Sequence, residues 1–549
     1  MGESKIKNTI QPTLNIEWND LFNDDRYCHQ LENQILPSYL QKCRWFGGKS
    51  RVVSAVKIYQ NIPIQTASNY VHFLLLKVRY PDGPTEIYTL PLAFVNEKHF
   101  QAPSQAVLCR IENPVNSGYI IDAIHDEDFR NALPNLIYRS AEIKGNHYPL
   151  MAQSNSALKD TAAEFGISKV LNSDQSNSAI LYGNKYFLKL FRKVEYITNP
   201  DYEIVGYLTE QNNFHQLPKL AGSISLQHPE KKPMLVMMLQ EQVINQGDAW
   251  KYFTNEFKIF LERVIELDYH TKPLPIKPHT LALNFEQTPT ELRQIMGEEI
   301  YQKATLLGRR TAEMHLALGT NSGNADFEPE PIDEVFQKQL LQNINHLIDT
   351  RFSMLETNLE KIGGKLRDDA IDMISRKDRV KKFFATVLSR EMKGERIRIH
   401  GDYHLGQVLM TNSDFYILDF EGEPDKLHFE RRLKYPPLKD VAGMMRSFRY
   451  AAYSVIFTEY ASQPLLAEKL MVVADVWYHY VSRYYLGEYI KYTAGSNILP
   501  NEEKINDLLQ VYSFKKAIYE LGYEINNRPE WTVIPLQSLV KFVRHYLDA

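Results

Sequence analysis

The sequence predicts the α+β fold class with two lobes, because short apolar strands dominate its first part and helices dominate the rest. With 549 residues the chain is too long for one ordinary core, so two or three domains or lobes are expected. We expect a β-rich section with one early helix over residues 1–120 and a second β-rich section over 121–245. A mostly helical section follows over 246–549, and it contains a catalytic hairpin.

The second β-rich section carries the clearest local signals. Two apolar runs, 179–182 and 185–191, flank Gly183-Asn184 and predict a hairpin with a two-residue turn. Asn199-Pro200 then supplies an N-cap and a first-turn proline, which opens a helix. Residues 231–242 return to strand character.

The catalytic motif lies in residues 398–421. Asp402 stands in a loop, Gln407 follows five residues later, and Asp419 ends the next apolar run. Protein kinases have an Asp-x-x-x-x-Asn loop followed by a metal-binding Asp, and here Gln407 takes the place of Asn. That arrangement holds a hydroxyl, a magnesium ion and a nucleotide together. Together with the order of the β-rich and helical sections, it predicts a bilobal protein-kinase-like fold.

The residue types in this motif suggest separate roles. Asp402 is the expected general base, or the group that orients the attacking hydroxyl. Gln407 and Asp419 offer the oxygen ligands that Mg²⁺ prefers, and Glu421 is near enough in sequence to reach metal, water or substrate.

The remaining polar residues near the motif are ambiguous. His404 is expected to orient the loop or contact phosphate, although a hydrogen-bonded structural histidine explains it as well. His400 is interpreted as structural, and Asp440 as a brace for the catalytic loop at the start of another helix.

Nucleotide binding is predicted for the second β-rich section. Lys189 on a strand and Glu203 on the following helix have the order of the kinase ion pair, although a surface lysine and a solvated acid remain the alternative. No glycine-rich phosphate loop precedes the lysine. The short polar segment in its place predicts hydrogen bonds to ATP phosphates, or else an ordinary turn; its residues are Gln175, Ser176, Asn177 and Ser178. Glu241 and Val243 occupy the position of an adenine-binding hinge.

Composition restricts the partners and the compartment. Lys plus Arg number 63 and Asp plus Glu 67, and this balance argues against a nucleic-acid partner. The three cysteines are far apart in the sequence and predict free thiols in a reducing compartment. The N-terminus lacks signal-peptide character, and no apolar run approaches the ~20 residues of a membrane span, so we expect a cytoplasmic chain without a membrane partner.

Several motifs resemble those of one family. The strand lysine, the catalytic loop and the Asp419 segment are similar to the aminoglycoside phosphotransferase and choline kinase superfamily. Longer stretches resemble bacterial maltokinases, from about residue 35 to the end; they are residues 44–49, 307–313, 400–407, 418–424, 437–446 and 516–529.

The resemblance implies an N-terminal cap subdomain, an intermediate lobe with the hinge, and a helical C-lobe with the acceptor site. It implies ATP- and Mg²⁺-dependent phosphorylation of maltose to α-maltose 1-phosphate, which feeds glycogen or trehalose metabolism. A functional or fused partnership with a trehalose synthase is also implied, and we expect a monomer.

The acceptor is expected on a C-terminal helix. Lys516, Tyr519, Glu520 and Tyr523 fall at i, i+3, i+4 and i+7, so they share one helical face. Aromatic faces and charged groups together suit a sugar ring, and Arg528, with Asn527, follows one turn later. Without the family resemblance, a surface Lys–Glu pair beside two packing tyrosines explains the pattern better.

Other functions are also consistent with these motifs. A kinase of the same fold acting on glucosamine or an aminoglycoside would have a strongly acidic acceptor pocket, whereas a mixture of Lys, Tyr and Glu suits a neutral disaccharide. A non-catalytic pseudokinase is disfavoured because Lys189, Glu203, Asp402, Gln407 and Asp419 are all present.

Overall fold

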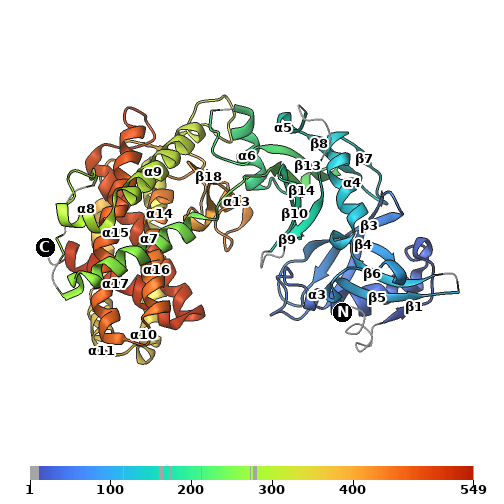
Figure 1. Ribbon diagram of the computed structural model, residues 1–549, viewed down its shortest axis with the longest axis horizontal. Coiled ribbons are helices and arrows are strands. Elements are labelled where there is room, and N and C mark those ends of the chain that lie inside the picture. Colours follow the sequence, from blue (N-terminus) through green and yellow to red (C-terminus); the bar gives the residue numbers. More distant parts are fainter. Residues whose placement is uncertain are drawn as a thin grey trace. The chain divides into compact units, whose positions relative to one another are not determined.

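The computed structural model describes residues 12–114, 116–159, 165–171, 176–211, 213–271, 274–275 and 281–547. The chain divides into two compact units, Met1–Glu210 with Pro218–Ile244 and Gln211–Leu217 with Asn245–Ala549. Strands dominate the first unit and helices the second (Figure 1), which confirms the predicted α+β class. The finer division at residues 120 and 245 stays a prediction.

The first unit contains two sheets. Among the described residues, the first sheet has the order β1-β5-β6-β4-β3-β2, and β12 pairs with β4. Its strand β3 is apolar and almost wholly buried, because it lies between two neighbouring strands and beneath the helices that precede the sheet. The elements are α2 (Asp25–Gln30), a short π-helix (Leu31–Ile35), α3 (Leu36–Lys42), β1 (Thr13–Leu14), β2 (Ala55–Gln65), β3 (Tyr70–Arg79), β4 (Glu86–Asn96), β5 (Val107–Glu112), β6 (Ser117–Asp122) and β12 (Lys193–Val194).

The second sheet carries the predicted hairpin. Its order in the described part of the chain is β7-β8-β13-β14-β11-β10-β9. Tyr182 pairs with Tyr186, so the hairpin loop has three residues and the two-residue prediction is wrong. The loop begins at Gly183, whose φ of +56° suits glycine. The strands are β7 (Glu142–Ile143), β8 (Leu150–Ser154), β9 (Ser168–Leu171), β10 (Ser178–Tyr182), β11 (Tyr186–Leu190), β13 (Leu220–His228) and β14 (Lys231–Glu241).

Helices of the first unit connect or cover these strands. Helix α6 (Pro200–Gln211) begins as predicted, with the Asn199 side chain accepting a hydrogen bond of 3.1 Å from the Tyr202 amide. Helix α4 (Glu127–Tyr138) has the same kind of N-cap at Asp126, whose carboxylate accepts from the Phe129 amide. A short helix, α5 (Ser156–Lys159), follows β8.

The second unit is built around one buried helix. Helix α14 (Leu438–Glu459) contacts α7, α15 and α16, and almost every residue from Leu438 to Ile456 is buried. The other helices are α7 (Ala249–Glu266), α8 (Thr290–Met296), α9 (Glu298–Leu318), α10 (Glu334–Thr357), α11 (Gly364–Ser375), α12 (Lys377–Leu388), α13 (His428–Arg431), α15 (Pro464–Thr493), α16 (Glu502–Asn527) and α17 (Val533–Leu547). In the described part of the chain, none of the helices has the length and hydropathy required to span a bilayer.

The catalytic motif forms a small hairpin within this helical unit. A 3-10 turn (Leu405–Gln407) leads into β17 (Val408–Met410), which pairs with β18 (Phe415–Ile417). The turn between these strands is closed by a hydrogen bond of 2.8 Å from the Thr411 amide to the Asp414 carbonyl. Another two-stranded sheet joins β15 (Glu330–Pro331) to β16 (Glu395–Arg396).

Candidate active site

The catalytic loop is fixed by one buried acid. The Asp440 carboxylate accepts hydrogen bonds from the amides of His400 at 2.8 Å and Gly401 at 3.0 Å. Burial raises the pKa of Asp440, but hydrogen bonding to His315 and the surrounding charges outweigh it and hold the pKa below its usual value. The predicted bracing role of Asp440 is thus confirmed.

Two close backbone approaches add to this fixation. Gly401 has a φ of +90°, and a Cβ atom there would lie 3.1 Å from the Cα of Gly422. A Cβ atom on Gly443 of α14 would lie 2.8 Å from the Tyr403 carbonyl oxygen. Glycine at both positions therefore allows the loop to sit directly against α14 and the Gly422 turn.

Asp402 faces two basic side chains. Its Oδ1 lies 3.5 Å from Lys516 Nζ and its Oδ2 lies 3.9 Å from His404 Nε2. Burial lowers the pKa of His404 despite the opposing charge of Asp402. The other ring nitrogen of His404, Nδ1, accepts a hydrogen bond of 3.1 Å from the Gly406 amide. These contacts leave His404 a loop-positioning role, while its catalytic role stays a prediction.

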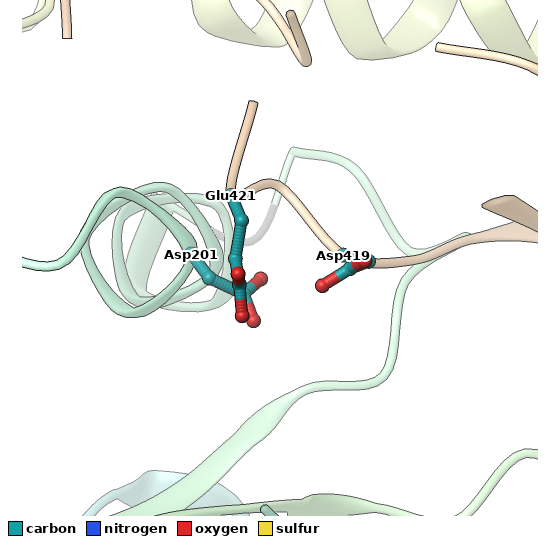
Figure 2. A group of neighbouring side chains, drawn as sticks. All are labelled: Asp201, Asp419 and Glu421. Atoms are coloured by element: carbon teal, nitrogen blue, oxygen red, sulfur yellow. The ribbon is translucent and has the colours of Figure 1, made fainter. Parts of the chain in front are cut away.

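The predicted metal ligands lie close together in the second unit. Carboxylate oxygens of Asp419 and Glu421 lie within 4.8 Å of each other, and Figure 2 shows both side chains on the segment that follows β18. Asp419 has a φ of +63°, an uncommon conformation that aims its carboxylate. Two carboxylates at this separation fit a hard divalent cation such as Mg²⁺.

Gln407 fits the same cation less directly. Its Nε2 donates a hydrogen bond of 3.0 Å to Asp419 Oδ2. In this orientation the amide presents nitrogen, and not oxygen, to Asp419. Sharing one cation with Asp419 requires the amide to turn about its terminal bond.

The strand lysine has an acidic partner on the expected helix. Lys189 Nζ lies 3.2 Å from Asp201 Oδ2, and the two side chains are 12% and 2% exposed. Sequence reasoning chose Glu203 for this partner. Residues 201 and 203 lie about 200° apart around an α-helix, so they belong to different faces of α6. Figure 2 shows Asp201 on α6, and a nucleotide role for Glu203 stays a prediction.

The polar segment before β10 is held by one buried arginine. Arg192 donates from Nε to Ser178 Oγ at 2.8 Å and from its backbone amide to Asn177 Oδ1 at 3.4 Å. Its Nη2 also donates to Asp122 Oδ2 at 2.7 Å, and both side chains are almost fully buried. Ser176 lies in the exposed bend before them, and Gln175 lies outside the described residues.

The expected hinge lies at the end of β14. The Glu241 amide donates to the Lys219 carbonyl at 2.9 Å, and the Gln242 amide donates to the Lys185 carbonyl at 2.7 Å. Burial raises the pKa of Glu241, with Lys219 opposing the shift. Val243 follows directly, and adenine binding by this segment stays a prediction.

The predicted acceptor face of α16 divides into two parts. Lys516 and Tyr519 line a cavity beside the catalytic loop, together with Gly401. Glu520 instead accepts a hydrogen bond of 3.0 Å from Nε of Arg446, a buried residue of α14. Its first role is therefore to neutralise that arginine.

The end of α16 lies nearer the surface. Tyr523 is 49% exposed, and the guanidinium of Arg528 lies 5.5 Å from its ring centroid. Arg528 also forms an i,i+4 ion pair with Glu524 at 2.8 Å. The Asn527 side chain donates to the Tyr523 carbonyl at 2.9 Å. Sugar binding by Tyr523 and Arg528 stays a prediction.

Lysines that sequence reasoning did not select surround the same cavity. Two adjoining cavities of about 70 and 170 Å³ share Gly401, Glu423 and three lysines. We call this hollow the lysine pocket; its charged residues are Glu423, Lys426, Glu430, Arg431, Lys439, Lys515 and Lys516. The available sequence signal was that Lys515 directly precedes Lys516, the first residue of the predicted acceptor face.

The first β-rich section matches a known domain family. Residues 39–126 match the family described as the maltokinase N-terminal cap domain. A curated glucosamine kinase of Streptacidiphilus jiangxiensis is 26% identical over 144 residues, which cover 26% of this chain. The match spans 31% of that relative, about a third of its length.

Solved structures extend the similarity to the whole fold. A glucosamine kinase in complex with glucosamine, ADP and inorganic phosphate has a TM-score of 0.60 and 15% identity, and covers 96% of this chain and 100% of its own. Glucosamine kinase in crystal form A has a TM-score of 0.57 and 16% identity, over 89% of this chain and 92% of its own. At these identities the similarity shows a shared fold. Residues 39–126 thus match the maltokinase N-terminal cap domain family, and the fold of the chain is similar to that of the solved glucosamine kinase structures.

Proposed function

We propose that this protein transfers the γ-phosphoryl group of ATP to the anomeric hydroxyl of maltose, giving α-maltose 1-phosphate and ADP. The observation that carries the proposal is the lysine pocket beside Asp402. Lysines outnumber acids in its lining, which suits a neutral or anionic sugar and repels an ammonium-bearing one. The cap-domain match at residues 39–126 supports maltose as the neutral sugar.

The residues of the second unit would act on the acceptor. Asp402 would hold the anomeric hydroxyl and take its proton as the oxygen attacks the γ-phosphorus. The bond from this phosphorus to the bridging oxygen breaks, and ADP leaves with that oxygen. Lys516, 3.5 Å from Asp402, would keep the carboxylate oriented toward the hydroxyl.

The residues of the first unit would bind the nucleotide. Lys189, held by Asp201, would contact the ATP phosphates, and Ser178 and Asn177, which accept hydrogen bonds from Arg192, would do the same. In the second unit, Asp419 and Glu421 would hold a divalent cation, which when bound neutralises charge on the phosphoryl oxygens. Cytoplasmic location, a trehalose synthase partner and a monomeric state are proposed with this function.

Glucosamine is the second candidate acceptor. The full-length structural similarity to glucosamine kinases favours it. At neutral pH the glucosamine ammonium would face Lys426, Lys439, Lys515 and Lys516, which weighs against it.

One screen tests the proposal. Purified protein with ATP and Mg²⁺ is assayed for phosphate transfer to maltose, glucose, glucosamine and kanamycin. We expect the highest kcat/KM with maltose and a 1-phosphate product by ³¹P NMR. A higher kcat/KM with glucosamine or kanamycin would refute the maltose assignment.

A further inference from the structure

The lysine pocket holds more positive charge than its neighbours neutralise. Lys439 Nζ lies 3.7 Å from Glu423, and Lys516 Nζ lies 3.5 Å from Asp402. In the described ranges no acid lies within ion-pair distance of Lys426 or Lys515. Two acids, Glu423 and Glu430, therefore line the pocket against five basic side chains: Lys426, Arg431, Lys439, Lys515 and Lys516.

Burial makes this surplus costly. Burial and the charges of Lys439 and Lys426, opposed by Glu423, lower the pKa of Lys515 to about 8. Uncompensated cations of this kind destabilise a fold unless an anion joins them.

The shape of the pocket limits which anion fits. Its walls come from α10 at Leu347, from the catalytic loop at Gly401 and from α16 at Lys515. The volumes of about 70 and 170 Å³ suit a small polyatomic anion with part of an attached ring. Lysine ammonium groups bind phosphate as point charges, without the planar geometry that arginine imposes.

We propose that the lysine pocket binds a phosphate dianion beside the catalytic loop, either as free phosphate or as the phosphate monoester that the reaction makes. The choice of a sugar phosphate rests on the proposed function, whereas the anion site rests on the geometry of the pocket. Occupation by product would slow release of the sugar phosphate and block the next acceptor.

Calorimetry on the full chain tests the site. Inorganic phosphate and α-maltose 1-phosphate are titrated separately into wild type without nucleotide. We expect Lys515→Met to raise the Kd of each bound anion at least about tenfold, equivalent to ~1.4 kcal/mol. Lys426 is exposed and tolerates substitution. Lys426→Met should raise the Kd of each anion about threefold, a change of the size that a surface ion pair contributes. Lys491, whose side chain is 69% exposed on α15, is the control, and Lys491→Met should leave the Kd unchanged.

The results separate the two sources and the two proposals. Tighter binding of the ester assigns the pocket to the product, and tighter binding of inorganic phosphate assigns it to free phosphate. If wild type binds neither anion at millimolar concentration, or if Lys515→Met and Lys426→Met bind as wild type does, the pocket proposal is wrong even where maltose is phosphorylated. If lysine-dependent binding occurs but maltose is not a substrate, the pocket stands and the proposed function falls.

Discussion

Buried cations of the first unit have acidic partners, whereas the lysines of the second-unit pocket outnumber theirs. Arg192 pairs with Asp122, and Lys189 pairs with Asp201. The lining of the lysine pocket has two acids, Glu423 and Glu430, against five basic side chains: Lys426, Arg431, Lys439, Lys515 and Lys516. Paired charges stabilise one conformation of the hairpin. Surplus positive charge can instead be neutralised by an anionic ligand. Substitutions in the two regions should therefore change the free energy of unfolding in opposite directions. Loss of a paired acid should lower it, and loss of a surplus lysine should raise it.

The largest expected effect concerns the acid beside the pocket. Asp402→Asn should lower kcat by about 10²–10⁴-fold, the usual reach of a positioned base. The free energy of unfolding should barely change, since the Asp402–Lys516 pair is part-exposed and such pairs contribute ~0–1 kcal/mol. Steady-state kinetics and thermal unfolding measure both, with Asp326→Asn as an exposed control. A folded Asp402→Asn variant that keeps most of its kcat would remove Asp402 from the chemistry.

Replacing Asp122, the acid that pairs with Arg192 in the first unit, should instead lower the stability of the fold. Asp122→Asn leaves Arg192 buried without its counter-charge, which typically costs about 3–5 kcal/mol of stability. Chemical denaturation of wild type and variant measures this loss. We expect a smaller loss for Asp82→Asn, an exposed acid of the same unit. Equal unfolding midpoints for Asp122→Asn and wild type would mean that the pair is not a structural anchor.

The ion pair at Lys189 distinguishes the two acids of α6. Lys189→Ala should raise the KM for ATP about 10–100-fold, because a charged hydrogen bond contributes ~1.5–3 kcal/mol. A double-mutant cycle with Asp201→Asn should give a coupling energy of about 0.5–3 kcal/mol, and the cycle with Glu203→Gln a smaller one. A larger coupling energy between Lys189 and Glu203 would support the sequence-based prediction that these two residues form the ion pair.

Removing a surplus lysine should stabilise the fold. Lys515→Met keeps the apolar stem and should raise the free energy of unfolding at pH 7 by on the order of 1–3 kcal/mol. The pKa of Lys515 in the folded state, about 8, lies below its usual value, so between these pKa values the unfolded chain binds more protons. Wild-type stability therefore rises with pH through this window, and the advantage of the variant shrinks. Denaturation at pH 7 and pH 10 measures the change; an unchanged or destabilised variant at pH 7 would show that Lys515 is already compensated.

Local patterns predicted the catalytic hairpin and the start of α6, because spacing, turn residues and caps act over a few positions. They did not predict which acid of α6 meets Lys189, since that depends on how the helix is rotated against β11. The lysine pocket was missed for a similar reason. Its members Lys426, Lys439 and Lys515 come from distant segments that only tertiary packing brings together. The role of Glu520 likewise depends on Arg446 of the neighbouring helix α14.

The smallest expected effect concerns the far end of α16, beyond the lysine surplus. Tyr523→Ala should raise the KM for maltose about tenfold, equivalent to ~1.4 kcal/mol, if its ring stacks against the C–H face of the sugar. The KM for ATP should not change. Glu520→Gln should also raise the KM for maltose, and it lowers stability because Arg446 loses its counter-charge, so this variant needs an unfolding measurement beside its kinetics.

Tyr138→Ala is the matched control for Tyr523→Ala, because Tyr138 is 43% exposed on α4 and Tyr523 is 49% exposed. A wild-type maltose KM in Tyr523→Ala would restrict the acceptor to the part of α16 that carries Lys516 and Tyr519. The neutral sugar would then bind entirely beside the surplus lysines, and its phosphorylated product would need no movement to reach them.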